Sequence, residues 1–577
     1  MVQQTQFVVT DVGSTTTKAL LFEKVENSWR FVAKGEAATT VEAPYANVMI
    51  GVINAFTKLR DRSNINFFTV EGQELKTNIP YLSTSSAGGG LQMVVCGHVG
   101  KISAESAQRA ALGGGAILLD VFAADDGRSL YQRLERLRTL RPDMILLSGG
   151  VDLAEPGSFL IEMCDFIRSA QPKPKFGYHY ALPIIYAGTS KAVDLVHDLL
   201  GDRYAIKVVD NLRPSFQDEN LSPTREAIHE LFIEHVMSHA PGYAKLKEVT
   251  TTDIMPTPTA VGEILTRYAI REKKNILCVD IGGATTDVFS VVQGNYMRSV
   301  SANFGMSYSI GHVASTAGAE NIARWLPQGL LTEEDMMILI GTKLIYPTDL
   351  PATKEELLTE QAVAREALRL SFEDHQQIAK IQKPTLLRFG QTLAQASEAV
   401  RSLTIEDFDL IIGSGGVLSN APNRKDAAVM LIDAFQPTGV VELMVDSVFM
   451  LPHLGVFSKI DEQGAIDLLE TECLIPLGTV LAPKGFGKKG QPGLTLRGTT
   501  SAGHRFEQTF YWGRLNFMDL SETEQATLEV IAHGETKWPL RFQKLHVRGG
   551  KCGVIVDLRG RPMEVKVCRN TELFDEK

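Results

Sequence analysis

The sequence has few cysteines, and their spacing gives no sign that they act together. Only six of the 577 residues are cysteine, and no Cys-x-x-Cys pair occurs. Neither a zinc site nor a disulfide framework is therefore indicated. Basic residues are fewer than acidic ones, and the net charge is −10. This negative charge argues against a nucleic-acid partner. The cysteines are Cys96, Cys164, Cys278, Cys473, Cys552 and Cys568.

No apolar run approaches the roughly 20 residues that a membrane-spanning helix needs. The first residues, MVQQTQFVVTDVG, lack the charged and apolar regions of a signal peptide. We therefore expect a soluble, cytoplasmic protein. The composition, 44% hydrophobic and 22% charged, is that of an ordinary globular protein, and 577 residues imply several domains.

Two common nucleotide-binding motifs are missing as well. The glycine-rich stretch at 81–90 is not followed by Gly-Lys-Ser/Thr, so it is no P-loop, and we interpret it as a strand with a glycine-rich exit. No Gly-x-Gly-x-x-Gly motif is found either. Binding of a nucleotide would need a different kind of turn.

Such a turn lies in residues 275–292, NILCVDIGGATTDVFSVV. An apolar strand over 276–281 leads into a glycine turn, and a second strand starts at Phe289. Glycines let backbone N–H groups approach an anion, threonine hydroxyls add donors, and carboxylates hold hydrated Mg²⁺. One such hairpin is a moderate signal, because any tight turn favours Gly, Thr and Asp.

The same pattern opens the chain, where the turn DVGSTTTK at 11–18 joins two apolar strands. Two such hairpins suggest two related half-domains facing one nucleotide. A third element is the strand at 409–412, whose following glycines would let the backbone lie against an adenine ring. The predicted nucleotide-binding residues are Gly13, Ser14, Thr15, Thr17, Lys18, Gly282, Gly283, Thr285, Thr286, Gly413, Ser414, Gly415 and Gly416.

In this order the three motifs resemble the phosphate-1, phosphate-2 and adenosine motifs of the actin, sugar-kinase and heat-shock-chaperone ATPase superfamily. The resemblance implies that ATP binds between two halves and that Asp11 and Asp280 hold Mg²⁺ through water. Asp280 or Asp287 would orient or deprotonate the attacking water. Lys18 could meet either phosphate or an acidic neighbour, and the sequence leaves both open.

Strands and helices alternate regularly between residues 88 and 250, which predicts an inserted Rossmann- or flavodoxin-like domain with a parallel sheet. Glycines at 113–115, 148–152 and 188–190 end its elements. These glycines are compatible with a small-molecule site at the carboxyl edge of the sheet. They are also compatible with a protein-docking role for the domain, and we favour the docking role. His235 and His239 lie one turn apart, but their spacing misses the His-Glu-x-x-His motif, so packed histidines are the better interpretation.

After the second hairpin we expect a loop at 303–316 that closes over the phosphates. Helices are expected at 332–340, 353–371 and 388–402. The Gly/Pro/Lys-rich stretch at 483–493 predicts a boundary, followed by a small β-rich domain. The expected organisation is an ATPase core at 1–87 and 251–482, an inserted α/β domain at 88–250 and a C-terminal β-rich domain at 493–577.

Long stretches resemble the MutL/GlmL family, the accessory proteins of adenosylcobalamin-dependent glutamate mutase, which are unrelated to the mismatch-repair protein of the same name. The similar stretches include VTDVGSTTTKALLF, SSAGGGLQMVVCGHV, IIYAGTSKA, SPTREAIHELF, VDIGGATTDV and RGGKCGVIVDLRGRP. The resemblance implies an α/β protein with a duplicated actin-like ATPase fold. It implies a slow, chaperone-like ATPase that uses ATP and Mg²⁺ to protect or reactivate a cobalamin mutase.

Three other classes stay open at this point. A small-molecule kinase or an ATP-dependent amidohydrolase, of the hydantoinase or oxoprolinase type, would need an acceptor pocket facing the γ-phosphate. An iron–sulfur activator of acyl-CoA dehydratases also begins with a turn of this kind, but it would need cysteines placed to share a cluster between subunits. A filament-forming scaffold is the structural alternative, and the oligomeric state, a dimer included, is open.

Overall fold

The structure is a computed structural model, and it describes most of the chain. The described residues are 5–13, 16–41, 45–71, 74–86, 91–114, 116–152, 158–174, 181–215, 218–232, 241–301, 303–382 and 400–563. The chain forms two compact units, each treated by itself below. The first unit is Met1–Arg267, Leu386–Glu398 and Leu451–Glu472, and the second is Tyr268–Thr385, Ala399–Met450 and Cys473–Lys577.

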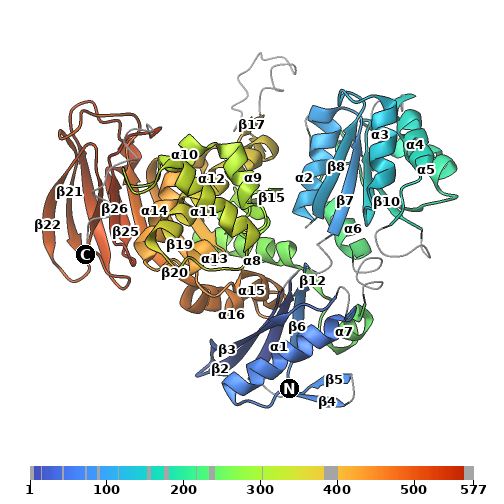
Figure 1. The fold of residues 1–577 in the computed structure, drawn as a ribbon, viewed down its shortest axis with the longest axis horizontal. Helices are drawn as coiled ribbons and strands as arrows, with labels where there is room; N and C mark the ends of the chain where they lie inside the picture. The colour runs from blue at the N-terminus through green and yellow to red at the C-terminus, as the bar shows by residue number, and fades with distance from the viewer. Residues whose placement is uncertain are drawn as a thin grey trace. The chain divides into compact units, whose positions relative to one another are not determined.

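The first unit contains a five-stranded mixed sheet that begins with the N-terminal hairpin (Figure 1). Its first three strands form an antiparallel meander, while the fourth and fifth run parallel to the first. Helix α1 (Val48–Ser63) packs on this sheet, and Asn47 caps its first turn by accepting a hydrogen bond from the N–H of Met49. In sheet order the strands are β3 (Ser28–Ala38), β2 (Thr16–Val25), β1 (Gln6–Val12), β6 (Tyr81–Ser85) and β12 (Met255–Pro256).

The second unit repeats this strand order and these directions. Its first three strands again form an antiparallel meander, and the next two are again parallel to the first. The duplication expected from the two hairpins is thereby confirmed, and the fold is the mixed α/β, actin-like one. In sheet order the repeated strands are β15 (Asn295–Ser301), β14 (Thr286–Val292), β13 (Ile276–Ile281), β18 (Leu410–Ser414) and β19 (Gly439–Asp446).

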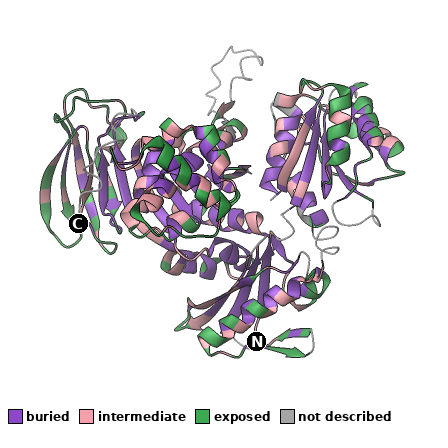
Figure 2. Cartoon of the chain, in the orientation of Figure 1, coloured by how far each residue is buried: buried purple, intermediate pink, exposed green. Residues whose placement is uncertain are grey.

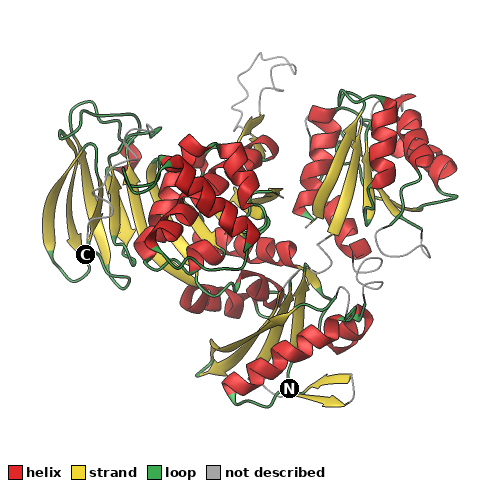
Figure 3. Ribbon diagram, in the orientation of Figure 1, coloured by secondary structure: helices red, strands yellow, loops and turns green. Residues whose placement is uncertain are grey.

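The two repeats differ in the connection between their fourth and fifth strands. In the second unit this connection holds only α13 (Gly416–Ser419) and α14 (Arg424–Phe435). In the first unit it holds a complete parallel sheet, with helices on both faces (Figure 3). Its strands, in sheet order, are β11 (Ala205–Val208), β10 (Pro183–Tyr186), β9 (Met144–Ser148), β7 (Leu91–Gly97) and β8 (Ala116–Ala123).

This inserted sheet has the flavodoxin-like strand order, in which the first strand lies between the second and the third. Three of its helices share one apolar cluster on one face, and the other two share an apolar cluster with the first sheet. The inserted residues are therefore not separable from the core of the first unit. The helices are α3 (Leu130–Thr139), α4 (Ser158–Ala170) and α5 (Val193–Leu200) on the first face, and α2 (Glu105–Gly113) and α6 (Ser222–Leu231) on the second.

A helical lobe follows the second hairpin. The loop expected at 303–316 is shorter than predicted, because α9 begins at Ile310 and ends at Ala317. A 25-residue helix, α12 (Lys354–Ile378), begins with a capping box formed by Thr353 and Glu356. The remaining helices of the lobe are α10 (Ala319–Ala323) and α11 (Glu333–Ile345).

Helix α12 is fixed to the second sheet by a buried histidine. The two ring nitrogens of His375 lie 2.8 Å from the hydroxyls of Ser299 and Ser290, which belong to neighbouring strands. Burial lowers the pKa of His375 to about 3, so the ring is neutral. The helix expected at 388–402 lies mostly outside the described residues, and its end is wrong, because Val400–Ser402 forms strand β17, which pairs with β16 (Lys380–Gln382).

The C-terminal part is β-rich but is not a sheet of its own throughout. Two C-terminal strands, β23 (Leu515–Met518) and β26 (Val554–Asp557), extend the large sheet of the second unit beyond β20 (Leu474–Ala482). Figure 2 shows β26 as buried. The other C-terminal strands form a separate four-stranded sheet. Its strands, in sheet order, are β22 (Arg505–Tyr511), β21 (Pro492–Thr500), β24 (Gln525–Ala532) and β25 (Lys544–Arg548).

A buried ion network holds the end of the described chain against α14. Arg559 binds Asp557 at 2.8 Å and Asp433 at 2.9 Å, and Arg561 binds Asp557 at 2.7 Å. Arg365 of α12 binds Asp433 at 2.7 Å. Burial alone would raise the pKa of Asp557, but Arg559 and Arg561 hold it well below its ordinary value.

Replacing Asp557 with Asn should destabilise the second unit by about 3 kcal/mol or more, because buried guanidinium groups lose their counter-charge. The folded-state pKa of Asp557 is depressed, so its contribution is present at neutral pH and is lost as the pH falls below about 4. Thermal melting should therefore show a large difference from wild type at pH 7 that narrows in acid. Glu507→Gln, in the exposed Arg497–Glu507 pair, is the matched control and should change little. Equal melting of both variants would contradict this account.

Candidate functional site

A carboxylate lies near the end of the first strand of the first hairpin, and hydrogen bonds within the described residues hold only one of its two oxygens. Asp11 is 4% exposed, and its Oδ1 accepts hydrogen bonds from the hydroxyls of Thr84, at 2.9 Å, and Thr257, at 2.6 Å. Among the described residues, Oδ2 of Asp11 has no hydrogen-bond donor. Two fixed bonds to one oxygen orient the group and leave the second oxygen for a ligand.

The turns of the two hairpins are closed by the same bond. The N–H of Gly13 donates to the carbonyl of Thr16 at 3.0 Å, and the N–H of Gly282 donates to that of Thr285 at 2.8 Å. The cross-strand pairs also correspond, because Asp11 faces Lys18 where Asp280 faces Asp287. Two of the predicted residues of the first turn, Ser14 and Thr15, lie outside the described residues.

The second turn is described in full, and its N–H groups point to an open side. Gly283 and Ala284 are exposed, and their N–H groups have no acceptor within the described chain. The carbonyls on the other side are used, since Met306 and Ser307 donate their N–H groups to Gly282 and Gly283 at 2.9 and 2.8 Å. An exposed run of free N–H groups is suited to bind an anion.

The carboxylates of the second hairpin lie beside a buried guanidinium. Asp280 faces Asp287 across the strand pair, and Arg298 donates from Nε to Asp287 at 2.8 Å. Arg298 is itself only 4% exposed. Two carboxylates beside one guanidinium carry one net negative charge, which favours a divalent cation near Asp280. Asp287 is bound by Arg298.

Two predicted threonine donors have structural partners instead. Thr17 is buried, and its hydroxyl lies 3.0 Å from that of Thr39. Thr286 is also buried and donates to the carbonyl of Phe304. Lys18 is half-buried, and its cross-strand neighbours are acidic: Asp11 on one side and Glu36 on the other.

The glycines of the third motif have different roles. Gly413 lies in the interior of β18, and Gly415 has φ +99°, where an added methyl group would come within 2.2 Å of the carbonyl oxygen of Ile281. Ser414 is 2% exposed and faces Asp280 across the parallel pair. Gly416 is exposed and has open space where a side chain would be, so of these four residues it is the one available to a ligand.

The sequence matches the family model described as MutL protein over residues 7–473. The chain belongs to the MutL protein family. "Protein MutL" of Clostridium tetanomorphum is 28% identical over 482 residues, which cover 78% of this chain and 96% of that protein.

Solved structures similar to this MutL-family chain match only weakly. Nucleotide-free acetone carboxylase covers 88% of this chain and 81% of its own, with 11% identity and a TM-score of 0.35. The activator of 2-hydroxyisocaproyl-CoA dehydratase from Clostridium difficile, with bound ADPNP, covers 81% and 98%, with 8% identity and a TM-score of 0.27. The fold assignment therefore rests on the repeated strand order and not on these similarities.

One residue beside the first turn was missed at the sequence level. His453 of α15 (Leu451–Phe457) is fully buried in the first unit, and the charges of Asp11 and Lys18 both act on it. Burial lowers the pKa of His453 to about 4, so its ring is neutral at physiological pH. No local pattern marks this position, because more than 400 residues separate it from the turn.

The part of the chain that the structure describes bears on metal-binding clusters, membrane-spanning helices and paired cysteines. There, no group of three or more His, Cys, Asp and Glu side chains could hold a metal ion, and no helix is both long and apolar enough to cross a membrane. His235, His239 and Cys568 lie outside that part of the chain. The five described cysteines are buried as free thiols.

The third motif gives a direct test with a matched pair. Gly415→Ala should lower the melting temperature, because its φ costs about 1–3 kcal/mol for a residue with a side chain and the new methyl group would collide with Ile281. Gly416→Ala should melt like wild type, because nothing lies within contact distance. Differential scanning calorimetry of both variants checks this, and an unchanged Gly415→Ala protein would contradict it.

Proposed function

We propose that this chain is an ATP-driven accessory protein that protects or reactivates an adenosylcobalamin-dependent mutase of the glutamate mutase type. The observation that supports the ATPase part is the duplicated hairpin, in which each turn follows a strand with an aspartate near its end. Membership of the MutL family supports the accessory role. The mutase partner comes from the resemblance of the sequence motifs to that family.

The chain's own groups account for nucleotide binding in simple terms. Phosphate oxygens accept hydrogen bonds from the exposed N–H groups of Gly283 and Ala284, and the turn at Gly13 is closed in the same way. Each unit has one carboxylate, Asp11 in the first and Asp280 in the second, that would hold a hydrated Mg²⁺, whose charge would offset that of the phosphates. Gly416 borders the adenosine.

The attacking water needs one carboxylate to orient it or to take its proton. Of the two candidates in the second hairpin, we assign this role to Asp280, which lies near the end of β13 beside the turn; Asp287 binds Arg298. The two carboxylates and the guanidinium of Arg298 together carry one net negative charge, which is low enough for a phosphate to approach. Asp287 keeps a positioning role, since it fixes the guanidinium beside the turn.

The second turn is linked to the helical lobe through its carbonyls. Residues 306 and 307 donate to Gly282 and Gly283, and Gly305 packs so closely on Ala284 that a methyl group there would come within 2.4 Å of its backbone. Each peptide thus faces phosphate through its N–H and the loop through its C=O. Binding or loss of phosphate changes the hydrogen bonding of both at once, which lets a nucleotide bias the lobe.

The residues between β6 and β12 form the second element that we propose acts on the partner. The corresponding connection in the second repeat is short. The inserted sheet therefore extends the first repeat without altering its strand order. Iron–sulfur activation is disfavoured, because the five described cysteines are buried. A small-molecule kinase and an ATP-dependent amidohydrolase are left as the alternatives that experiment must decide.

The first functional test uses hydrolysis of ATP by purified protein. Asp280→Ala should reduce turnover by about 100-fold or more, because a positioned carboxylate is lost, while weakened binding of ATP stays measurable. Asp287→Asn should lose much less if Arg298 is its main partner. Phosphate release and binding of a fluorescent nucleotide give the two readings. Undiminished turnover in Asp280→Ala would remove this turn from the mechanism.

The second test adds the proposed partner. Hydrolysis should be slow for the protein alone and should rise when a mutase with inactivated cofactor is added, because the client shifts the equilibrium between states that the nucleotide also shifts. Mutase activity should return only with hydrolysable ATP and fresh adenosylcobalamin, and not with Asp280→Ala. Rapid phosphorylation of a small molecule without an effect on the mutase would instead make the protein a kinase.

A further inference from the structure

Helix α11 and the connection that follows it expose an unusual number of large apolar side chains. Nineteen such side chains are exposed in the described chain, and six of them lie within the 14 residues from 337 to 350. Leu350 is 85% exposed and Ile345 is 71% exposed. Single exposed apolar residues are normal, whereas a contiguous group marks a binding surface. The six are Met337, Ile338, Leu344, Ile345, Tyr346 and Leu350.

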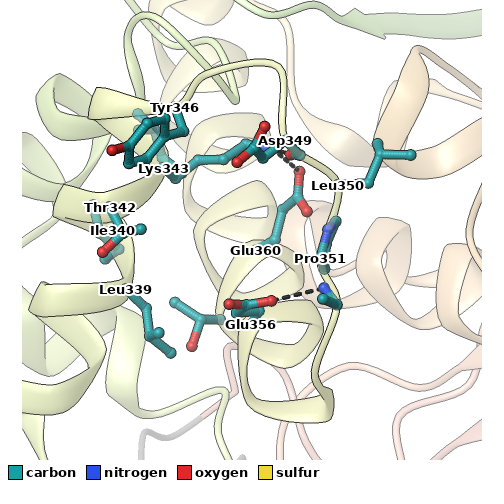
Figure 4. A pocket seen from close by; sticks show the side chains of 13 residues that line it. Leu339, Ile340, Thr342, Lys343, Tyr346, Asp349, Leu350, Pro351, Glu356 and Glu360 are labelled. Carbon is teal, nitrogen blue, oxygen red and sulfur yellow. Dashed lines mark hydrogen bonds and ion pairs between the residues drawn. The ribbon is translucent and has the colours of Figure 1, made fainter.

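A cavity lies beside one end of this exposed group, at Tyr346 and Leu350 (Figure 4). The other four exposed side chains do not line it. Its walls come from α9, α11, α12 and the connection between the last two helices, and Tyr346 and Leu350 belong both to the cavity and to the exposed group. Exposed anchors beside a hollow are the usual arrangement at a protein-binding site. The apolar lining is Ile310, Leu339, Ile340, Tyr346, Leu350 and Pro351.

The segment that carries this surface is rich in acidic residues. Residues 333–360 contain seven acidic and two basic side chains. One of the two basic groups, Lys343, is turned inward, where it binds the carbonyl of Asp349 and lies 3.5 Å from Glu360. An occupant must therefore be apolar where it contacts α11 and basic around that contact.

A second copy of this chain does not meet that requirement. In a twofold dimer through this surface, the same patch would lie on both sides of the interface. Two strongly acidic surfaces would then face each other, which disfavours the contact. A different protein with basic groups around an apolar segment gains both the apolar contact and the charge attraction.

The position of this surface connects it to the second turn. Ile310 lines the cavity and is the first residue of α9, and the loop before it donates hydrogen bonds to Gly282 and Gly283. One residue further along α9, a methyl group added to Gly311 would lie 3.3 Å from the side chain of Leu344. The wall of the cavity is thus continuous with the loop that contacts the turn.

We propose that the surface formed by α11 and residues 346–351 binds a basic, apolar segment of the client protein. The identity of the client as a mutase rests on the function proposed above, but the chemistry of the segment rests on this surface alone. The contact is apolar at Ile345, Tyr346 and Leu350, and the acidic residues around it select Lys- and Arg-bearing segments.

The test uses two labelled synthetic peptides with identical leucines, one carrying lysines and the other glutamates in their place. Fluorescence anisotropy with the full-length protein, without nucleotide, measures the affinity of each. The lysine peptide should bind about tenfold or more tightly than the glutamate peptide, and its affinity should fall with added salt. Because no ATP is needed, a failure of the ATPase proposal leaves this measurement readable.

Two variants assign the binding to this surface. Leu350→Lys and Ile345→Lys should each weaken the lysine peptide by about tenfold or more. Leu540→Lys is the matched control, because Leu540 is 86% exposed in the C-terminal part and Leu350 is 85% exposed. All three change exposed residues and should fold like wild type, which thermal melting verifies.

Four results would overturn the proposal. These are equal binding of the two peptides, binding of neither, equal affinity of Leu350→Lys and Leu540→Lys for the lysine peptide, and self-association of the wild type that Leu350→Lys abolishes. The last result, seen by sedimentation velocity, would show that a second copy of the chain occupies this surface.

Discussion

The pairing of the first strand of each repeat with its fourth strand is the constraint on which the candidate site depends. It sets Asp11 opposite Thr84 in one unit and Asp280 opposite Ser414 in the other. Because a parallel neighbour fixes the strand end, the carboxylate at that end is oriented before any ligand arrives. A shift of one residue in either register would move the aspartate to the opposite face of its sheet.

This constraint also explains why the third motif needs its glycines. β18 must run close beside β13 to set the register, and Gly415 then passes directly over the backbone of Ile281, where no side chain fits. The requirement is one of packing, and it would hold without a nucleotide. It leaves Gly416, one residue later, as the exposed position. A glycine-rich motif can thus combine a structural and a ligand-facing residue.

Local sequence patterns predicted the parts of the fold that are local. Both hairpins, the alternation that begins at β7 and the long helix α12 follow from apolar periodicity and turn residues. What sequence could not show depends on distant contacts. Arg298 pairs with Asp287 across strands, and the charge of Asp11 acts on His453, more than 400 residues away in the sequence. The early start of α9 is a tertiary effect, because the loop before it is fixed by hydrogen bonds to the second turn.

The C-terminal strands were harder to place for the same reason. The glycine- and lysine-rich stretch before them indicates a boundary, yet β26 returns to pair with β20, and the Arg559–Asp557 network then fixes it against α14. The buried network joins Arg365, Asp433 and Arg559, which lie far apart in the sequence, so no local charge run reveals it. The acidic residues near α11 are visible in the sequence, but which apolar side chains of that helix stay exposed is not. In the folded second unit, Asp433 and Asp557 are buried with arginine partners, whereas apolar side chains of α11 stay exposed in a stretch rich in acidic residues. The position of both features in the second unit therefore depends on contacts between distant segments, and composition alone does not show it.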